Sequence, residues 1–326
     1  MGTSSSYCKK QERLIEMAVF TSNDVENLFQ RQFEVWETAK NNFDALKGVK
    51  VKALKVGNAT FNVQFNPGRI VSSAAKVDAK SLAERKCFLC EANRPAVQEG
   101  LAWENYTVLI NPFPIFPRHL TIPCNDHTDQ LISGRIGDMM SIASLLPEYI
   151  LFYNGPKCGA SAPDHMHFQA GNKGFMTFDT DLAKGEVELV KEVAGAKLDY
   201  VKGLGRVALV VTADNKDAGV ALFNELFAAL PQKADETEAM LNILCWVEGE
   251  QWKIAVFPRK QHRPSCYSAE GDANILISPA SVDMGGVFIT PLEKDFEKIT
   301  SEDIQMILDE VCFSEEDTEK LISTLK

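Results

Sequence analysis

Short apolar segments with strand character recur along this 326-residue chain, and several follow one another with only a turn between them. The first two, residues 49–56 and 59–66, are separated by Gly57 and Asn58, which favour a tight turn. Similar elements return after about residue 185, again with a helical segment among them. This order predicts an α+β fold with mainly antiparallel sheets flanked by helices, in two halves of similar size.

An amphipathic helix is expected over residues 22–48, because apolar residues recur there at helical spacing and Gly48 can close it. In the first half, strands are expected over 106–116, 119–124, 148–155 and 165–171, and a helix over 129–146. In the second half, the expected elements are strands over 206–213, 240–247, 252–259 and 282–291, a helix over 217–230 and two acidic helices at the end. No low-complexity linker interrupts the chain, so we predict an N-terminal helical extension (1–58), a first half (59–185) and a second half (186–326).

Charge and hydropathy narrow the class of protein. The net charge of −11 argues against a general nucleic-acid binder, because phosphate backbones require a basic surface. It leaves open a small phosphorylated substrate that is held by local donors. No uniformly apolar stretch reaches the roughly 18 residues of a membrane-spanning helix, so we expect no membrane partner.

The N-terminal sequence and the distribution of the cysteines indicate the cellular compartment in which the protein is expected. The segment MGTSSS loosely fits an acylation pattern, but a polar N-terminal segment is the simpler interpretation. It lacks the apolar core of a signal peptide. The eight cysteines are spread along the chain, without the density of a disulfide scaffold. A reducing, cytoplasmic location is therefore expected.

Cys87 and Cys90 form a Cys-x-x-Cys pair, whose spacing lets both sulfurs bind one tetrahedral zinc ion. Two further ligands would come from the five histidines of the chain. His127 follows a predicted strand, and His165 and His167 would share one face of another, so one could bind metal while the other does chemistry. The alternative interpretation is a pair of small buried cysteines.

Residues 159–171, GASAPDHMHFQAG, place two histidines and a glutamine behind a turn of small residues. Such a turn can offer backbone N–H groups to phosphate oxygens. A neutral histidine can attack the α-phosphorus of a nucleotide and form a covalent nucleotidyl-histidine. Gln169 can donate a hydrogen bond to a phosphate but supplies no proton, which favours transfer over hydrolysis. The alternative is a structural histidine pair with satisfied hydrogen bonds.

The same residues resemble the active-site motif of the histidine-triad superfamily, in the transferase branch that ends in glutamine. That branch includes galactose-1-phosphate uridylyltransferase, dinucleoside tetraphosphate phosphorylase and the GDP-hexose phosphorylases. The resemblance implies two histidine-triad-like halves, with His167 as the nucleophile and Gln169 on the phosphates. It also implies that Asn111 lies near the ribose and that Asn154 and Ser161 lie near the phosphates.

The resemblance extends to the metal and to two outlying segments. In the uridylyltransferases, structural zinc is bound by four residues that correspond here to Cys87, Cys90, His127 and His165. The segment VQFNPGR resembles the GDP-hexose phosphorylases, which implies a role for Arg69 on phosphate or base. The strand and helices over 282–317 are similar to the same enzymes.

Arg259 lies in a short basic cluster, FPRKQHRP, within an acidic protein. Such a cluster is commonly a solvated strand end, but it could also bind a sugar phosphate or phosphate.

The function expected from these features is nucleotidyl transfer from a GDP- or UDP-hexose, through a nucleotidyl-histidine on His167. The expected partners are the nucleotide sugar and a phosphate or sugar phosphate acceptor, with structural zinc as cofactor and a homodimer as a candidate assembly. Two alternatives stay open: a dinucleoside polyphosphate phosphorylase or hydrolase, and a nucleotide-binding sensor without turnover.

Overall fold

The computed structural model describes residues 20–70 and 77–326, and the acylation pattern at the N-terminus lies outside them. Ten α-helices in the described residues are α1 (Ser22–Val35), α2 (Glu37–Ala45), α4 (Ala79–Glu84), α5 (Ile136–Leu145), α6 (Phe178–Asp181), α7 (Lys216–Ala229), α8 (Ser281–Met284), α9 (Glu293–Lys298), α10 (Ser301–Val311) and α11 (Glu315–Ser323). No helix in these two described stretches is long and apolar enough to cross a membrane.

The strands build two sheets, of ten and of three strands. Their bounds are β1 (Lys50–Val56), β2 (Ala59–Phe65), β3 (Gly100–Trp103), β4 (Tyr106–Ile110), β5 (His119–Pro123), β6 (Tyr149–Asn154), β7 (His167–Asn172), β8 (Glu186–Val193), β9 (Ala196–Lys202), β10 (Ala208–Ala213), β11 (Leu241–Glu248), β12 (Gln251–Pro258) and β13 (Val287–Thr290). The large sheet has the order β3-β4-β5-β7-β6-β11-β12-β10-β9-β8, and all its pairs are antiparallel. The predicted α+β class with mainly antiparallel sheets is confirmed.

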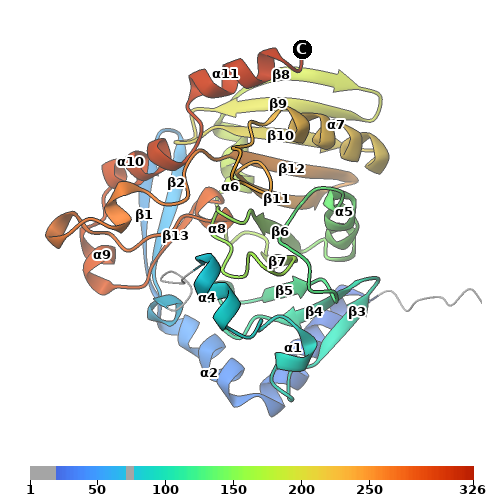
Figure 1. The fold of residues 1–326 in the computed structure, drawn as a ribbon, viewed down its shortest axis with the longest axis vertical. Helices are drawn as coiled ribbons and strands as arrows, with labels where there is room; N and C mark the ends of the chain where they lie inside the picture. The colour runs from blue at the N-terminus through green and yellow to red at the C-terminus, as the bar shows by residue number, and fades with distance from the viewer. Residues whose placement is uncertain (1–19, 71–76) are drawn as a thin grey trace, which may run out of the picture.

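The two predicted halves share the large sheet, because β6 of the first pairs with β11 of the second. Figure 1 shows this sheet running from β8 at one end of the molecule to β3 at the other. The small sheet contains the hairpin β1–β2, with β13 from the C-terminal part paired in parallel to β2.

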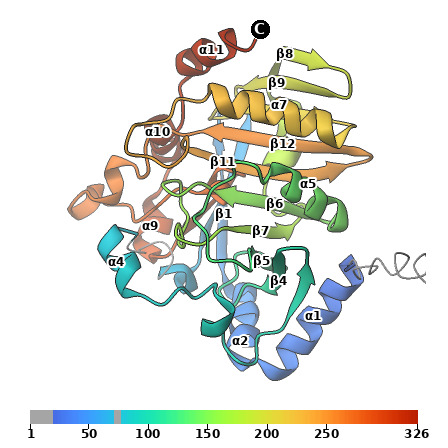
Figure 2. The same cartoon turned by 45° about the vertical axis from the view of Figure 1, so that its right-hand side comes forward.

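Apolar cores lie on both faces of the large sheet because side chains alternate along each strand. On β6, Leu151 and Tyr153 pack in the core under α1, α5, α7 and α11, whereas Ile150 and Phe152 face the other core. This second core lies between the large sheet and the layer formed by β2, β13 and α10. Figure 2 shows α5 and α7 covering the first face.

Two expected elements are interrupted. The single helix over 22–48 is wrong, because the chain leaves helical geometry at Trp36, with φ −120° and ψ 83°. The break lets Phe29 of α1 pack edge-to-face on Phe43 of α2, with ring centroids 5.6 Å apart. The strand over 106–116 ends at Ile110, just before the Pro-rich sequence NPFP.

The strand expected over 282–291 begins instead as helix α8, and β13 starts only at Val287. Gly286 makes the turn between them, with φ 95°. A Cβ atom at this position would lie 2.0 Å from Thr177 Oγ1, so both the backbone conformation and the close approach require glycine. Strands β3, β8 and β9 had no counterpart among the predicted elements.

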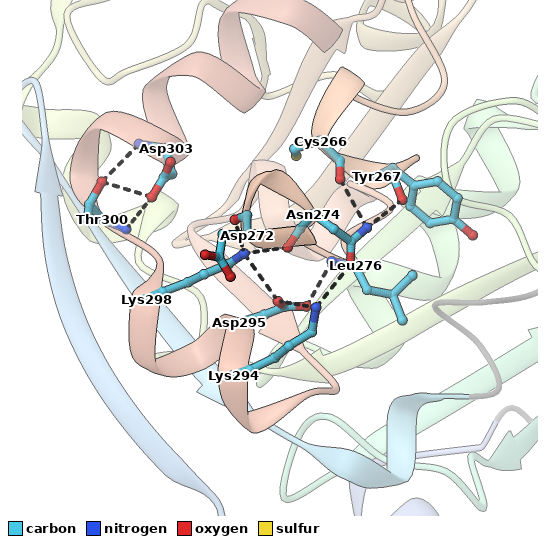
Figure 3. A network of polar contacts seen from close by, with 10 residues as sticks. All are labelled: Cys266, Tyr267, Asp272, Asn274, Leu276, Lys294, Asp295, Lys298, Thr300 and Asp303. Atoms are coloured by element: carbon cyan, nitrogen blue, oxygen red, sulfur yellow. Dashed lines mark hydrogen bonds and ion pairs between the residues drawn. The ribbon is translucent and has the colours of Figure 1, made fainter. Parts of the chain in front are cut away.

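A polar network fastens the segment between β12 and α8 to helix α9 (Figure 3). The fully buried Asp295 accepts the N–H of Leu276 at 2.9 Å and lies within 3.8 Å of the ammonium groups of Lys294 and Lys298. Lys298 also donates to the carbonyl oxygens of Asp272 and Asn274. The network therefore holds in place a segment that goes on to line the cavity described below.

Replacing Asp295 by alanine should lower the free energy of unfolding by about 2–3 kcal/mol, because the partly buried N–H of Leu276 loses its acceptor and two ammonium groups lose their counter-charge. We expect earlier unfolding in urea and faster proteolytic cleavage within residues 260–280. Asp272→Ala is the matched control, because Lys298 contacts the carbonyl of Asp272 and not its carboxylate. Equal stability of the two variants would contradict this role of Asp295.

Candidate active site

A cavity of about 920 Å³ opens on the face of the large sheet that looks toward β13 and α8. Its floor includes side chains from β5, β6 and β7, and its far wall comes from α8, β13 and the segment that precedes them. The lining includes, among others, Trp36, Arg69, Phe88, Asn111, Phe113, Thr121, Phe152, Asn154, Ser161, His167, Gln169, Ser278, Asp283 and Ile289. The cavity thus combines an apolar lining with a few convergent polar groups, as ligand sites commonly do.

His167 is the first residue of β7 and is 4% exposed. Its Nδ1 lies 2.8 Å from the carbonyl oxygen of His165, so Nδ1 carries the proton and donates it. This tautomer leaves a lone pair on Nε2, which no hydrogen bond reaches from the described residues. Burial lowers the pKa of His167 to about 4, so the ring is neutral near pH 7. The geometry presents an unprotonated nitrogen at the wall of the cavity.

Gln169 is oriented by His119, a fully buried residue at the start of the neighbouring strand β5. The N–H of Ile115 donates to His119 Nδ1 at 3.1 Å, so the ring proton must be on Nε2. That proton is donated to Gln169 Oε1, at 3.0 Å. The amide oxygen of Gln169 is therefore occupied, and its NH₂ group remains as a donor.

His119 was not among the predicted site residues, and the sequence offers only a histidine at the start of an apolar segment. Burial first, and the nearby positive charge of Arg69 second, lower its pKa to about 3. The ring is thus a neutral donor to Gln169. The register of β5 against β7, which pairs Thr121 with Gln169, is what brings the two side chains together.

Three of the predicted substrate residues line the cavity, and some of their polar atoms already make hydrogen bonds within the protein. Asn111 donates to Thr121 Oγ1 at 2.9 Å and accepts from the N–H of Phe113. Asn154 accepts from the N–H of Ser281 at 2.7 Å, and its Nδ2 has no partner among the described residues. Arg69 donates to the carbonyl of Phe113 at 2.6 Å.

Ser161 also lines the cavity, so four of the five predicted substrate residues are brought together there. Arg259 is the exception: it is 2% exposed and is not among the lining residues. Its guanidinium group donates to Asn242 Oδ1 at 2.5 Å and to the carbonyl oxygens of four other residues. The structure therefore places Arg259 inside the fold, as a connection between β11 and the segments around it.

Asp283 of α8 is a cavity residue for which the sequence contains no signal. It is 5% exposed and accepts the N–H of Ala280 at 2.8 Å. Burial raises the pKa of its carboxyl group to about 7, although Arg259 and backbone N–H groups act in the opposite direction. The cavity thus has a titratable group on the wall opposite the sheet.

The four predicted metal ligands converge beside the cavity. The ligand atoms of Cys87, Cys90, His127 and His165 all lie within 4.8 Å of one another. Cys87 Sγ and Cys90 Sγ lie 3.3 and 3.6 Å from His165 Nδ1, and His127 Nδ1 lies 3.2 Å from both Cys90 Sγ and His165 Nδ1. A tetrahedral zinc ion with two sulfur and two nitrogen ligands requires separations of roughly 3.3–3.8 Å. The donor set and its spacing therefore fit zinc.

His165 departs from one sequence expectation. It precedes β7 instead of lying on it, so it does not share a strand face with His167. Its Nε2–H donates to the carbonyl oxygen of Cys124 at 2.8 Å, which leaves Nδ1 for a metal. Its own carbonyl accepts a hydrogen bond from His167 Nδ1, so the cluster of candidate metal ligands and His167 are joined through the main chain of His165.

Two family models match parts of this chain. Residues 28–172 match a family described as a domain of unknown function (DUF4922), and residues 208–325 match one described as the GDPGP1-like C-terminal domain. A curated relative is diadenosine 5',5'''-P1,P4-tetraphosphate phosphorylase 2 of Saccharomyces cerevisiae. It is 24% identical over 252 residues, which cover 71% of each chain.

The crystal structure of yeast Ap4A phosphorylase Apa2 superposes with a TM-score of 0.55 and 20% identity, over 85% of this chain and 94% of that one. Its complex with AMP superposes with a TM-score of 0.56 and 18% identity, over 85% and 95%. This chain therefore shares the fold of the yeast Ap4A phosphorylase over most of its length.

Purified wild-type protein should contain about one zinc ion per chain, because four ligands converge at tetrahedral spacing. Cys87→Ser should lose most of the metal and unfold at a lower temperature. Cys266→Ser is the control, since Cys266 is a buried cysteine on a different segment and should leave the metal content unchanged. Elemental analysis checks both, and wild-type protein with well under one equivalent would rule out the four-ligand site.

A buried acid, Glu238, contacts Tyr153 of β6, the strand next to the one that carries His167. Glu238 Oε2 accepts the N–H of Ile132 at 2.9 Å, and Glu238 Oε1 makes a short contact with the hydroxyl of Tyr153. Burial raises the pKa of Glu238 to about 7, although these hydrogen bonds act to lower it. When protonated, Glu238 can donate to Tyr153, whose hydroxyl then donates to the carbonyl oxygen of Gln130, at 3.1 Å.

The raised pKa makes Glu238 a source of pH-dependent stability. An acid whose folded pKa is above its unfolded value stabilises the fold at low pH, and this stabilisation is lost as pH rises through the folded pKa. Glu238→Gln reproduces the protonated hydrogen-bond pattern, so its stability relative to wild type should rise between pH 5 and 8 by up to about 3 kcal/mol. Urea unfolding at the two pH values measures this, with the exposed Glu250→Gln as a control that should show no such trend.

Proposed function

We propose that this protein is a nucleotidyltransferase that uses His167 to transfer a nucleotidyl group from a nucleotide sugar to phosphate or to a sugar phosphate. The observation that carries the proposal is the fixed tautomer of His167, with Nδ1–H bound to a carbonyl and Nε2 unprotonated at the cavity. A nitrogen with a free lone pair at a wall lined by neutral amide donors suits attack on a phosphorus atom.

In the first step, the lone pair of His167 Nε2 forms a bond to the α-phosphorus of the nucleotide sugar. The bond from that phosphorus to the bridging oxygen breaks, and its electron pair leaves with the hexose 1-phosphate. In the second step, an oxygen of the acceptor phosphate bonds to the same phosphorus, and the P–N bond returns its electron pair to Nε2. Both leaving groups depart without a proton from the protein.

The neutral donors around His167 fit this chemistry. The free NH₂ of Gln169 and the Nδ2 of Asn154 can donate to phosphate oxygens, and the guanidinium of Arg69 adds a positive charge at the cavity. Gln169 cannot protonate a leaving group, which favours an intermediate that persists until an acceptor arrives. Its orientation depends on His119, because the ring proton of His119 occupies the amide oxygen.

Zinc bound by Cys87, Cys90, His127 and His165 would be structural. It would fix His165, whose carbonyl oxygen holds Nδ1 of His167 at 2.8 Å. When bound, zinc supplies a rigid cross-link between the segments before β3, after β5 and before β7.

A second candidate is phosphorolysis of a dinucleoside polyphosphate. It is favoured by the similarity to the yeast diadenosine tetraphosphate phosphorylase in both sequence and fold. The cavity, at about 920 Å³, is large enough for a nucleotide together with a second sugar or nucleoside. The chemistry at His167 would be the same, with a different leaving group.

Incubation with GDP- or UDP-hexose labelled in the α-phosphate should give protein that carries an acid-labile, alkali-stable label. His167→Asn should reduce labelling by about 10³-fold or more, because the nucleophile is removed. His262→Asn is the matched control, since His262 is not among the residues that line the cavity. Added phosphate should release the label as nucleoside diphosphate.

Parallel incubation with labelled dinucleoside tetraphosphate separates the two candidates, and the faster donor identifies the class of substrate. A wild-type protein that binds nucleotides tightly but is labelled by none of these donors would contradict the transferase and favour a sensor.

A further inference from the structure

Gln130 lies between β5 and α5 and is fully buried at the point where β6 and β7 separate. The antiparallel ladder of these strands runs from the pair Tyr149–Asn172 to the pair Phe152–Gln169 and then stops. Continued in the same register, it would bring Asn154 opposite His167. The carboxamide of Gln130 bridges these two residues instead.

Three of the four hydrogen-bonding positions of this carboxamide are used, including both of its N–H donors. Gln130 Oε1 accepts the N–H of His167 at 2.8 Å, and Gln130 Nε2 donates to the carbonyl oxygens of His167 and Asn154 at 3.0 and 3.1 Å. Rotating the amide by 180° would place its NH₂ group against the N–H of His167 and its oxygen against the two carbonyl oxygens. The hydrogen bonds therefore fix the orientation of the amide. One side chain thus provides His167 with the donor and the acceptor that a neighbouring strand would provide.

Gln130 is itself held in place by its main chain. Its N–H donates to the carbonyl of Pro163 at 3.0 Å, and its carbonyl accepts the hydroxyl of Tyr153. The N–H and C=O of a strand residue point to the same side, so those of His167 point away from Pro123, its partner on β5, and toward Gln130. The main chain of His167 therefore depends on Gln130 for both of its polar groups.

The carboxamide of Gln130 also affects the spacing of the strands that form the cavity floor. Directly paired strands lie about 4.8 Å apart, and a carboxamide inserted between them requires a wider gap. The gap occurs at Asn154 and His167, whose side chains both line the cavity. Two anchors therefore fix His167: Gln130 on its main chain and the carbonyl of His165 on its ring.

We propose that Gln130 is a positioning residue that sets the place of the His167 nucleophile by taking the role of a missing strand neighbour. The expected effect of Gln130 on the reaction rate rests on the proposed function. The role of Gln130 in holding the main chain of His167 can be measured without any turnover. Gln130→Met removes the polar contacts while keeping a side chain of similar size. Gln32→Met is the matched control, because Gln32 is also fully buried and bridges a backbone carbonyl, of Val97, and a backbone N–H, of Glu99.

The structural part is tested by amide hydrogen exchange in protein labelled with ¹⁵N-histidine, which has five histidine signals. The His167 amide, assigned from its loss in His167→Asn, should be protected in wild type and in Gln32→Met. In Gln130→Met its exchange should accelerate by about tenfold or more, since the acceptor is gone. Unchanged protection in Gln130→Met, or an unprotected His167 amide in wild type, would overturn the inference.

The catalytic part is tested by the rate at which the nucleotidyl label forms. Gln130→Met should slow labelling by about 10- to 100-fold, because a displaced nucleophile loses its alignment, while the affinity for nucleoside monophosphate changes little. If Gln130→Met only reduced the fraction of folded protein, nucleotide binding and labelling would weaken together. That result would contradict a positioning role for Gln130.

Gln130→Asn provides a second variant if Gln130→Met does not fold, because its amide is one methylene shorter and should show the same two effects to a smaller degree. If the His167 amide loses protection in these variants but wild type forms no label with any donor, the proposed function fails while the structural role of Gln130 stands. Labelling of both variants at the wild-type rate would refute the positioning role alone.

Discussion

The separation of β6 from β7 is the constraint on which the rest of the site depends. These strands are central in the large sheet, and their direct pairing stops at Phe152 and Gln169. A sheet that opens at its centre exposes backbone polar groups that must find partners elsewhere. The carboxamide of Gln130 supplies those partners, and the opening becomes part of a cavity floor with His167 at its edge.

The polar groups around His167 are mostly neutral. Burial keeps His167 and His119 uncharged, and Gln169, Asn111 and Asn154 are amides. Their tautomers and amide orientations are set by backbone contacts, from Ile115 N–H through His119 to Gln169 and from the carbonyl of His165 to His167. Donors fixed before a substrate arrives need no reorganisation when charge develops on it, which is the basis of electrostatic preorganisation.

Much of the local chemistry could be predicted from the sequence, and some of it could not. Cys87, Cys90, His127 and His165 meet in space, as the resemblance to the uridylyltransferases implied. Arg259 was expected at a solvated strand end or on a sugar phosphate or phosphate, but its neighbours in space are carbonyl oxygens of several segments, and it is buried among them. Asp283 and His119 gave no sequence signal because each is recognisable only by what packs against it.

The sequence by itself determined the α+β class, the antiparallel strands and the motif that carries His167 and Gln169, because these follow from local periodicity, turn residues and side-chain chemistry. The tertiary structure decided that the two halves share one sheet through β6 and β11, that His165 turns away to the cluster of candidate metal ligands, and that Gln130 and His119 orient the two motif residues. These contacts join residues that are at least 37 positions apart, so they depend on strand register and packing and not on any local pattern.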